Sequence, residues 1–362
     1  MNYLPTPIDI KELTRADLIC LLQEERIAPY RAGQIFKWIY QHQVDRFEEM
    51  SDLNKPLRRQ LAARFVIGRL HRTAVETARD GARKYLLRLN DGRFIESVLI
   101  PEKEHYTLCI SSQVGCAQGC RFCLTAQEGF IRNLTMGEII AQVRDAVLDI
   151  PAADPRRLTN IVFMGMGEPL ANLTHVIRAL QIITDADSGL KFSARRVTVS
   201  TAGLAAQLDR LGRETEVNLA ISLNAADNKT RSRLMPINRR YPIEVLMAAC
   251  REYPLKPRRR ITFEYILIDG VNDGDKDARR LVDLLRPVRA KINLIPFNEH
   301  DGSPFCRPDE ARILKFQEIL TSQNYTAVIR HSKGQDISAA CGQLNARNRD
   351  GCPASGSASA MA

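Results

Sequence analysis

The run CAQGCRFC, from Cys116 to Cys123, is separated by four residues from the apolar stretch YTLCIS at 106–111. The apolar stretch predicts a β-strand, so Cys116, Cys120 and Cys123 fall on the loop after it. A loop lets three thiolates converge on one inorganic centre, which a helix or a strand does not. Thiolates suit iron–sulfur clusters and zinc. The spacing therefore predicts a metal centre held by three cysteines.

The number of ligands favours an iron–sulfur cluster over zinc. A closed zinc site needs a fourth ligand close by, and the nearest downstream cysteine and histidine are Cys250 and His175. Three thiolates on a [4Fe–4S] cluster leave one iron open, and that iron can chelate the amino and carboxylate groups of S-adenosylmethionine (SAM). Phe122, between the last two cysteines, is typical of the radical SAM superfamily. We interpret the run as a radical SAM cluster loop, with a zinc knuckle as the alternative.

After this loop, apolar strand-like runs alternate with amphipathic helical segments. The runs lie at 159–165, 196–201, 217–223, 261–268, 292–297 and 326–330. Such alternation indicates βα units and a parallel sheet, and six or seven units do not complete an eight-stranded barrel. We expect an α/β fold with an open, partial (β/α)6-type radical SAM barrel over 106–345. A doubly wound sheet is the structural alternative.

The flanking segments predict smaller parts. Residues 1–70 are expected to form a small helical accessory domain that binds RNA, with a first helix capped by Thr14. Residues 71–105 are expected to form a β-hairpin extension, because Asn90-Asp91-Gly92 separates two strand-like runs. Residues 346–362 are small and polar, which predicts a disordered tail.

Composition suggests the cellular setting and the partner. The chain has 362 residues, 52 Lys+Arg against 42 Asp+Glu, and nine cysteines. The net charge of +10 favours a polyanionic partner. The polar N-terminal sequence shows no signal peptide and no apolar run could span a bilayer, so we expect a cytoplasmic protein with reduced thiols and no membrane contact. Candidate phosphate contacts are the basic clusters Arg195-Arg196, Arg231 with Arg233, Arg239-Arg240 and 256–260.

Polar residues at the ends of the predicted strands indicate a SAM site. Gly165-Met166-Gly167-Glu168-Pro169 follows one strand, and Glu168 can accept a hydrogen bond from the SAM ammonium. Ser200 ends the next strand, and Ser222 with Asn224 ends the one after. Ligands of parallel α/β folds bind at this carboxyl edge.

Taken together, these motifs resemble one family closely, the dual-specificity ribosomal and transfer RNA adenine-C2 methyltransferases of the RlmN type. The matching segments are FIESVLIP at 94–101, CISSQVGCAQGCRFC at 109–123, RNLT at 132–135, FMGMGEPLAN at 163–172, VSTAG at 199–203, LAISLNA at 219–225, LIPFN at 294–298 and AACGQL at 339–344.

The resemblance implies a substrate and residue roles. The enzyme would methylate carbon 2 of adenosine in the peptidyl-transferase-centre loop of 23S rRNA and in tRNA, 3′ of the anticodon. Cys341 would be methylated and carry the carbon to RNA as a covalent adduct, Cys109 would resolve that adduct, and Glu96 would accept a proton. One [4Fe–4S] cluster and two SAM molecules per turnover are implied. The implied SAM contacts are Gly167, Glu168, Ser200, Ser222, Leu223, Asn224 and Asn298.

The chemistry explains why such parts are needed. Carbon 2 of adenine lies between two ring nitrogens and has no lone pair, so it cannot displace a methyl group from SAM, whereas a thiolate can.

The expected partners include an external electron donor and disulfide reductant of flavodoxin or thioredoxin type. We expect the protein itself to be a monomer. Three alternatives remain: a carbon-8 adenosine methyltransferase of 23S rRNA, a glycyl-radical activating enzyme, and a zinc-bearing RNA-binding module.

Overall fold

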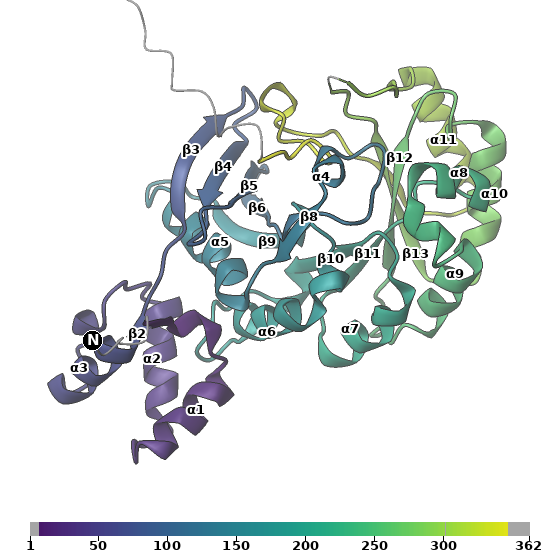
Figure 1. The fold of residues 1–362 in the computed structure, drawn as a ribbon. Coiled ribbons are helices and arrows are strands. Elements are labelled where there is room, and N and C mark those ends of the chain that lie inside the picture. The colour runs from purple at the N-terminus through teal and green to yellow at the C-terminus, as the bar shows by residue number, and fades with distance from the viewer. Residues whose placement is uncertain (1–6, 301, 347–362) are drawn as a thin grey trace, which may run out of the picture.

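The structure is a computed structural model that describes residues 7–300 and 302–346. Its centre is a ten-stranded mixed sheet in the order β14-β13-β12-β11-β10-β9-β6-β5-β4-β3 (Figure 1). The strands are β3 (His71–Thr77), β4 (Arg83–Arg88), β5 (Phe94–Pro101), β6 (His105–Cys109), β9 (Arg157–Phe163), β10 (Val197–Thr201), β11 (Asn218–Ser222), β12 (Ile261–Leu267), β13 (Ala290–Pro296) and β14 (Ala327–Ile329). Within the described ranges this sheet ends at β14 and β3 and does not close on itself.

The part of the sheet from β6 to β14 is parallel throughout. Each of the six apolar runs predicted after the cysteine loop forms one of its strands, so the expected open, partial α/β barrel is confirmed. Helices cover the outer face of this curved sheet (Figure 1). They are α5 (Met136–Leu148), α6 (Leu173–Thr184), α7 (Leu208–Glu214), α8 (Asn228–Leu234), α9 (Ile243–Glu252), α10 (Asp275–Leu285) and α11 (Glu310–Ser322).

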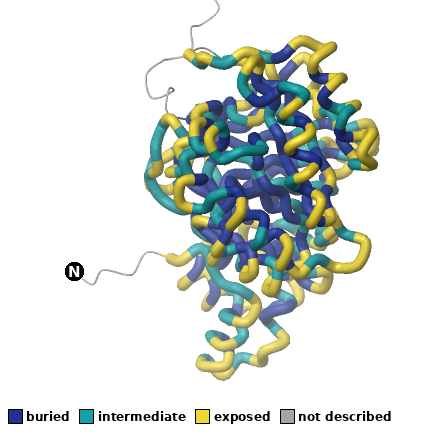
Figure 2. The backbone as a smooth tube through the Cα atoms, turned by 90° about the vertical axis from the view of Figure 1, so that its right-hand side faces the viewer, coloured by how far each residue is buried: buried dark blue, intermediate teal, exposed yellow. Residues whose placement is uncertain are grey.

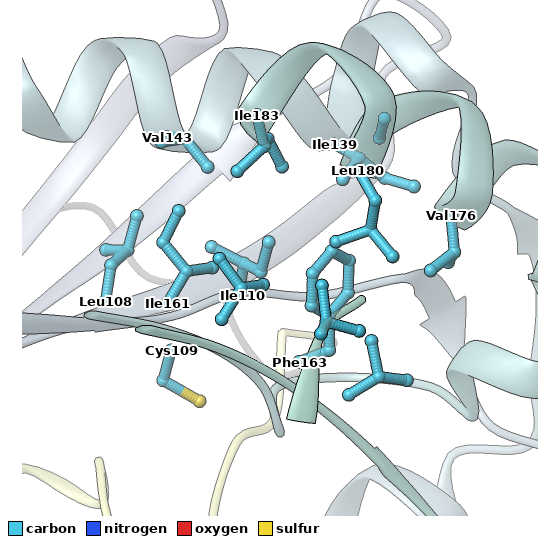
Figure 3. Packing of buried hydrophobic residues seen from close by; sticks show 14 of the residues in the cluster. Leu108, Cys109, Ile110, Ile139, Val143, Ile161, Phe163, Val176, Leu180 and Ile183 are labelled. Atoms are coloured by element: carbon cyan, nitrogen blue, oxygen red, sulfur yellow. The ribbon is translucent and has the colours of Figure 1, made fainter. Parts of the chain in front are cut away.

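The main core lies between the outer face of the sheet and these helices. Leu108, Ile161 and Phe163 of the sheet meet α5 and α6, and all three are buried (Figure 3). Burying one such side chain stabilises the fold by about 1.5–3 kcal/mol. Because side chains alternate along a strand, Cys109 points to the opposite, inner face, as Figure 3 shows. Figure 2 shows the same division, with the buried strands at the centre and exposed residues outside.

The N-terminal segment forms a helical lobe beside the barrel (Figure 1). It contains α1 (Arg15–Glu24), α2 (Arg31–Tyr40) and α3 (Lys55–Arg64), with short strands β1 (Ile8–Asp9) and β2 (Phe65–Val66). Thr14 caps α1 in a capping box, as its spacing to Asp17 predicts. Arg144 of α5 joins the lobe to the barrel, since its guanidinium donates to the carbonyls of Ile39 and Val44.

The predicted hairpin is present as antiparallel β4 and β5, and β3 extends it by one strand that the sequence did not suggest. None of the helices in the described ranges is long and apolar enough to cross a membrane. Of the expected C-terminal tail, residues 347–362 lie outside the described residues.

Candidate functional site

Two cavities lie along the inner face of the parallel strands. The upper cavity, of about 150 Å³, is lined at the carboxyl ends of the strands by residues that include Cys116, Cys120, Cys123, Glu168, Ser200 and Ser222. The lower cavity, of about 710 Å³, is lined nearer the amino ends of the same strands by residues that include Asn160, Thr198, Asn218, Thr262 and Asn293. The two cavities adjoin, because both are lined by Met164, Glu264, Ile295 and Cys341.

The cysteine loop is framed by a two-stranded ribbon that the sequence did not predict. β7 (Gln113–Gly115) pairs antiparallel with β8 (Phe130–Asn133), and the loop between them contains the short helix α4 (Leu124–Gln127). The N–H of Cys116 donates to the carbonyl of Gly129 at 3.0 Å. The ribbon thus brings the two ends of the loop together, and all three thiols line the upper cavity.

The three thiols have the chemistry that a cluster requires. Burial raises the pKa of each, that of Cys116 to about 12. Within the described residues, no group of three or more His, Cys, Asp and Glu side chains is arranged to hold a single metal ion. A [4Fe–4S] cluster has a separate iron for each thiolate, so its ligands need not meet at one ion. Its iron would also favour the thiolate form and so offset the raised pKa values. The loop therefore fits such a cluster.

Glu168 borders the same cavity because of the glycine before it. Gly167 has φ +95°, and a Cβ there would lie 2.4 Å from Cβ of Gln113, so a larger residue would push the two segments apart. Glu168 accepts hydrogen bonds from the N–H groups of Ala202 at 2.6 Å and Leu170 at 3.0 Å. Burial raises the pKa of Glu168 to about 7. The hydroxyl of Thr201 also donates to this carboxylate. Three donors leave one of its four lone pairs, so the carboxylate can still accept from an ammonium in the cavity.

The other residues expected to contact SAM divide into two groups. Three of them line the upper cavity, namely Ser200, Ser222 and Asn224. Leu223 is fully buried and does not line it. Asn298 does not line it either, and its side chain donates to the carbonyl of Cys341 at 3.2 Å. Asn298 thus supports the segment that carries Cys341.

The structure brings Cys109 and Cys341 to one cavity, although 232 positions separate them in the sequence. Cys109 ends β6 on the inner face, and Cys341 lies on the C-terminal segment. Burial raises the pKa of Cys109, and charge on Cys341 raises it further, so the two thiols interact. Surrounding protein atoms raise the pKa of Cys341 to about 11, while the residue stays accessible to solvent.

The segment around Cys341 packs directly on the cysteine loop. Gly342 accepts a hydrogen bond from the N–H of Leu124 at 2.8 Å, and the hydroxyl of Thr125 donates to the carbonyl of Leu344 at 2.7 Å. A Cβ at position 342 would lie 3.1 Å from the carbonyl oxygen of Phe122, and φ there is +84°. Glycine next to Cys341 therefore permits this close approach.

Glu96 lies under the same C-terminal segment. It is fully buried on β5 and lines neither the upper nor the lower cavity. Its Oε2 accepts from the N–H of Asn345 at 2.9 Å, and its Oε1 lies 3.6 Å from Nζ of Lys84. In this arrangement the segment that carries Cys341 also covers Glu96.

The basic clusters do not all lie on the surface. The prediction that Arg231 contacts phosphate is wrong, because this residue is fully buried. Its guanidinium donates to the carbonyls of Leu223 at 3.0 Å and Ala202 at 2.7 Å, and to the side chain of Asn238 at 2.9 Å. It thus joins the loops after β10 and β11, and Ala202 of the first loop lines the upper cavity. Arg195 and Arg196 are exposed and line the lower cavity.

We expect Arg231→Met to lower the free energy of unfolding by about 3 kcal/mol or more. The substitution leaves buried carbonyls without donors, and each such group costs about 1–3 kcal/mol. Urea denaturation measures the change. The matched control is Arg233→Met on the same helix, where the side chain is exposed and a change within about 0.5 kcal/mol is expected. Equal midpoints for the two variants would contradict this role.

Sequence reasoning missed the polar inner face of the lower cavity. Glu264 is 6% exposed on β12, and Asn293 of β13 donates to its Oε1 at 2.9 Å. Burial raises the pKa of Glu264 to about 7. The available signal was a period of two, since Thr262 and Glu264 alternate with Ile261, Phe263 and Tyr265 inside an otherwise apolar strand.

Comparison with known proteins identifies both parts of the chain. Residues 8–67 match the ribosomal RNA large subunit methyltransferase N-terminal domain, and residues 110–282 match the radical SAM superfamily. A protein of Desulfosudis oleivorans named dual-specificity RNA methyltransferase RlmN is 58% identical over 346 residues, 96% of this chain and 93% of the relative. A protein of the same name from Geobacter sulfurreducens is 54% identical, over 94% of this chain and 93% of the relative.

The fold also has a solved counterpart. The crystal structure of a radical SAM methyltransferase from Sphaerobacter thermophilus superposes with a TM-score of 0.88 at 46% identity. The match covers 94% of this chain and all of that chain. The helical lobe and the barrel are therefore both part of the shared architecture.

Proposed function

Because this chain belongs to the RlmN family of dual-specificity radical SAM RNA methyltransferases, we propose that it methylates carbon 2 of adenosine in 23S rRNA and in tRNA. The rRNA target is in the peptidyl-transferase-centre loop, and the tRNA target is the adenosine 3′ of the anticodon. The observation that carries the proposal is the placement of Cys109 and Cys341 on one cavity that adjoins the cysteine loop.

Cys341 is suited to receive a methyl group and pass it on. It lines both cavities, so its sulfur is accessible to SAM from above and to a nucleotide from below. The raised pKa keeps its thiol protonated at neutral pH, but the positive sulfonium of SAM would favour the thiolate that attacks the methyl group. One [4Fe–4S] cluster on Cys116, Cys120 and Cys123 would supply the electron that cleaves a second SAM to a carbon radical.

Release of the product needs two further groups. Cys109 lines the same cavity as Cys341, and its thiolate would attack the sulfur of Cys341, which would free the methylated base and leave a disulfide between the two cysteines. Glu96 is the proposed acceptor of the carbon-2 proton. Because Asn345 covers its carboxylate, the C-terminal segment would shift when RNA is attached to Cys341.

This assignment also implies a cellular setting and partners. We propose a cytoplasmic monomer that depends on an external electron donor and disulfide reductant of flavodoxin or thioredoxin type. Basic residues at the lower cavity provide favourable contacts for a phosphate backbone, namely Arg195, Arg196, Lys291, Arg330 and Lys333.

The proposal is tested by nucleoside mass spectrometry of 23S rRNA and tRNA from a strain that lacks the gene and has no second copy. We expect 2-methyladenosine to disappear from both RNAs, to return with the wild-type gene, and to stay absent with Cys341→Ala. Standards separate 2-methyladenosine from 8-methyladenosine. Unchanged 2-methyladenosine, or loss of 8-methyladenosine instead, would refute the assignment.

A further inference from the structure

Glu264 occupies the junction between the two cavities, and no role in the reaction described above uses it. Four residues line both cavities: Met164, Glu264, Ile295 and Cys341. Met164 and Ile295 are apolar, and Cys341 is the proposed carrier of the methyl carbon. Of the four residues that line both cavities, Glu264 is therefore the one that has a carboxyl group, and it shares both cavities with Cys341.

The carboxyl group is held in place from one side only. Glu264 pairs in register with Asn293 on β13 and Ser222 on β11. The amide of Asn293 donates to Oε1 at 2.9 Å, and within the described chain no other hydrogen bond reaches the Glu264 side chain. The residue is 6% exposed. Asn293 thus orients Oε1, which keeps a second lone pair, and Oε2 is left for a ligand, so both oxygens can meet a ligand in the cavities.

Burial makes the neutral form of Glu264 accessible near neutral pH. It raises the pKa of Glu264 to about 7, although the hydrogen bond from Asn293 and the charges of Arg330 and Lys291 oppose the shift. A carboxylic acid presents an O–H donor and a C=O acceptor side by side. The N1–N6 edge of adenine presents the complementary pair, a ring nitrogen that accepts and an amino group that donates. The lower cavity, at about 710 Å³, has room for a nucleotide.

We propose that Glu264 is a specificity-determining residue that hydrogen-bonds the N1–N6 edge of the target adenine at the junction of the cavities. This inference rests on the proposed function. Carbon 2 is bonded directly to N1, so a base whose N1 meets Glu264 presents carbon 2 toward the neighbouring Cys341. Because Asn293 donates to Oε1, the proton of the neutral acid lies on Oε2. Guanine has a donor at N1 and an acceptor at position 6, so in the same pose it opposes this fixed arrangement with the wrong pattern.

The test compares substrates in two proteins. Anticodon stem–loop RNAs carry adenosine or 1-deazaadenosine at the target, and kcat/KM is measured for wild type and Glu264→Ala. We expect the preference for adenosine over 1-deazaadenosine to be about 10- to 100-fold larger in wild type than in Glu264→Ala. Replacing N1 also changes the reactivity of carbon 2, but that change is common to both proteins and cancels in the ratio.

Matched variants separate recognition from folding. Glu264→Gln keeps one donor and one acceptor, so its kcat/KM for adenosine should stay within about threefold of wild type. Thr262→Val, on the same strand and the same cavity, should keep the full wild-type preference. Methylation of Cys341 by SAM without RNA, measured by intact-protein mass, reports whether the cavities remain formed in each variant.

Three outcomes would overturn the inference. The first is an equal preference for adenosine over 1-deazaadenosine in wild type and Glu264→Ala. The second is wild-type activity of Glu264→Ala on adenosine. The third is a Glu264-dependent preference for adenosine over 7-deazaadenosine instead of over 1-deazaadenosine, because Glu264 would then recognise N7 rather than N1. In each of these the wild type still produces 2-methyladenosine, and the proposed function stands. Wild type that methylates no adenosine at all would refute the proposed function itself, and the inference with it.

Discussion

Replacing Cys109 with alanine is expected to stop the enzyme after a single addition, with RNA covalently attached to Cys341. The two cysteines act at different times in the proposed reaction, and Cys109 acts last. Without its thiol, the methylene bridge between Cys341 and the base has no nucleophile placed to break it. Of the described cysteines, only Cys109 and Cys341 line the lower cavity, and the three that share the upper cavity with Cys341 would be held by the cluster. We expect multiple turnover to fall by at least about 10³-fold.

Denaturing gels before and after ribonuclease treatment would reveal the adduct, at about one RNA per chain. Cys250→Ala is the matched control, because Cys250 is also buried but lies on α9 and lines neither the upper nor the lower cavity. It should turn over normally and carry no RNA. Cys341→Ala should form neither methylated protein nor adduct. Normal turnover by Cys109→Ala, or a Cys341 that carries neither methyl nor RNA in that variant, would show that the two-cysteine mechanism is wrong.

Disulfide formation between the two cysteines sets a geometric condition on the C-terminal segment. The Cα atoms must come to about 4.4–6.8 Å at that moment. The segment is bonded to the cysteine loop through Leu124 and Thr125, and to Asn298 through the carbonyl of Cys341. Any movement of Cys341 toward Cys109 must therefore respect or break these three contacts, and the same movement would uncover Glu96.

The strands of the barrel could be predicted from the sequence because each is a short apolar run bounded by polar segments. All six runs after the cysteine loop became strands. The β7–β8 ribbon could not be predicted in this way, because its strands have only three and four residues and their pairing depends on a loop that reverses through Gly129. Its stability comes from tertiary contacts rather than from a local pattern.

The sequence predicts the residues of the candidate site whose chemistry and motif agree. It does not predict the residues whose role depends on whether their side chains are buried. The cysteine triplet, Glu168 and Ser200 all line one cavity, as strand-end positions suggest. Arg231 was misjudged because a charged residue in a basic cluster is normally exposed, and only the fold shows that it donates to carbonyls of two neighbouring loops. Glu264 escaped notice for the converse reason. Its alternation with apolar residues indicates a polar face of the strand, but only the fold shows that this face lines a cavity together with Cys341.

Replacing Cys120 with alanine is expected to remove the cluster and, with it, the reductive cleavage of SAM. Cys120 is the middle one of the three proposed ligands, and its thiol is buried beside those of Cys116 and Cys123. Two remaining thiolates do not retain a cubane that needs three, so iron should fall from about four per chain to near zero in protein prepared without air. Formation of 5′-deoxyadenosine should fall by at least about 10³-fold, because the electron no longer has a route to SAM.

The control is Cys306→Ala. Cys306 is exposed and lines neither the upper nor the lower cavity, so this variant should keep the full iron content and the brown colour of the wild type. Iron analysis, visible absorbance and chromatography of the SAM products measure the three quantities. Cys120→Ala protein that stays brown and still forms 5′-deoxyadenosine would rule out the assignment of this loop as the cluster site.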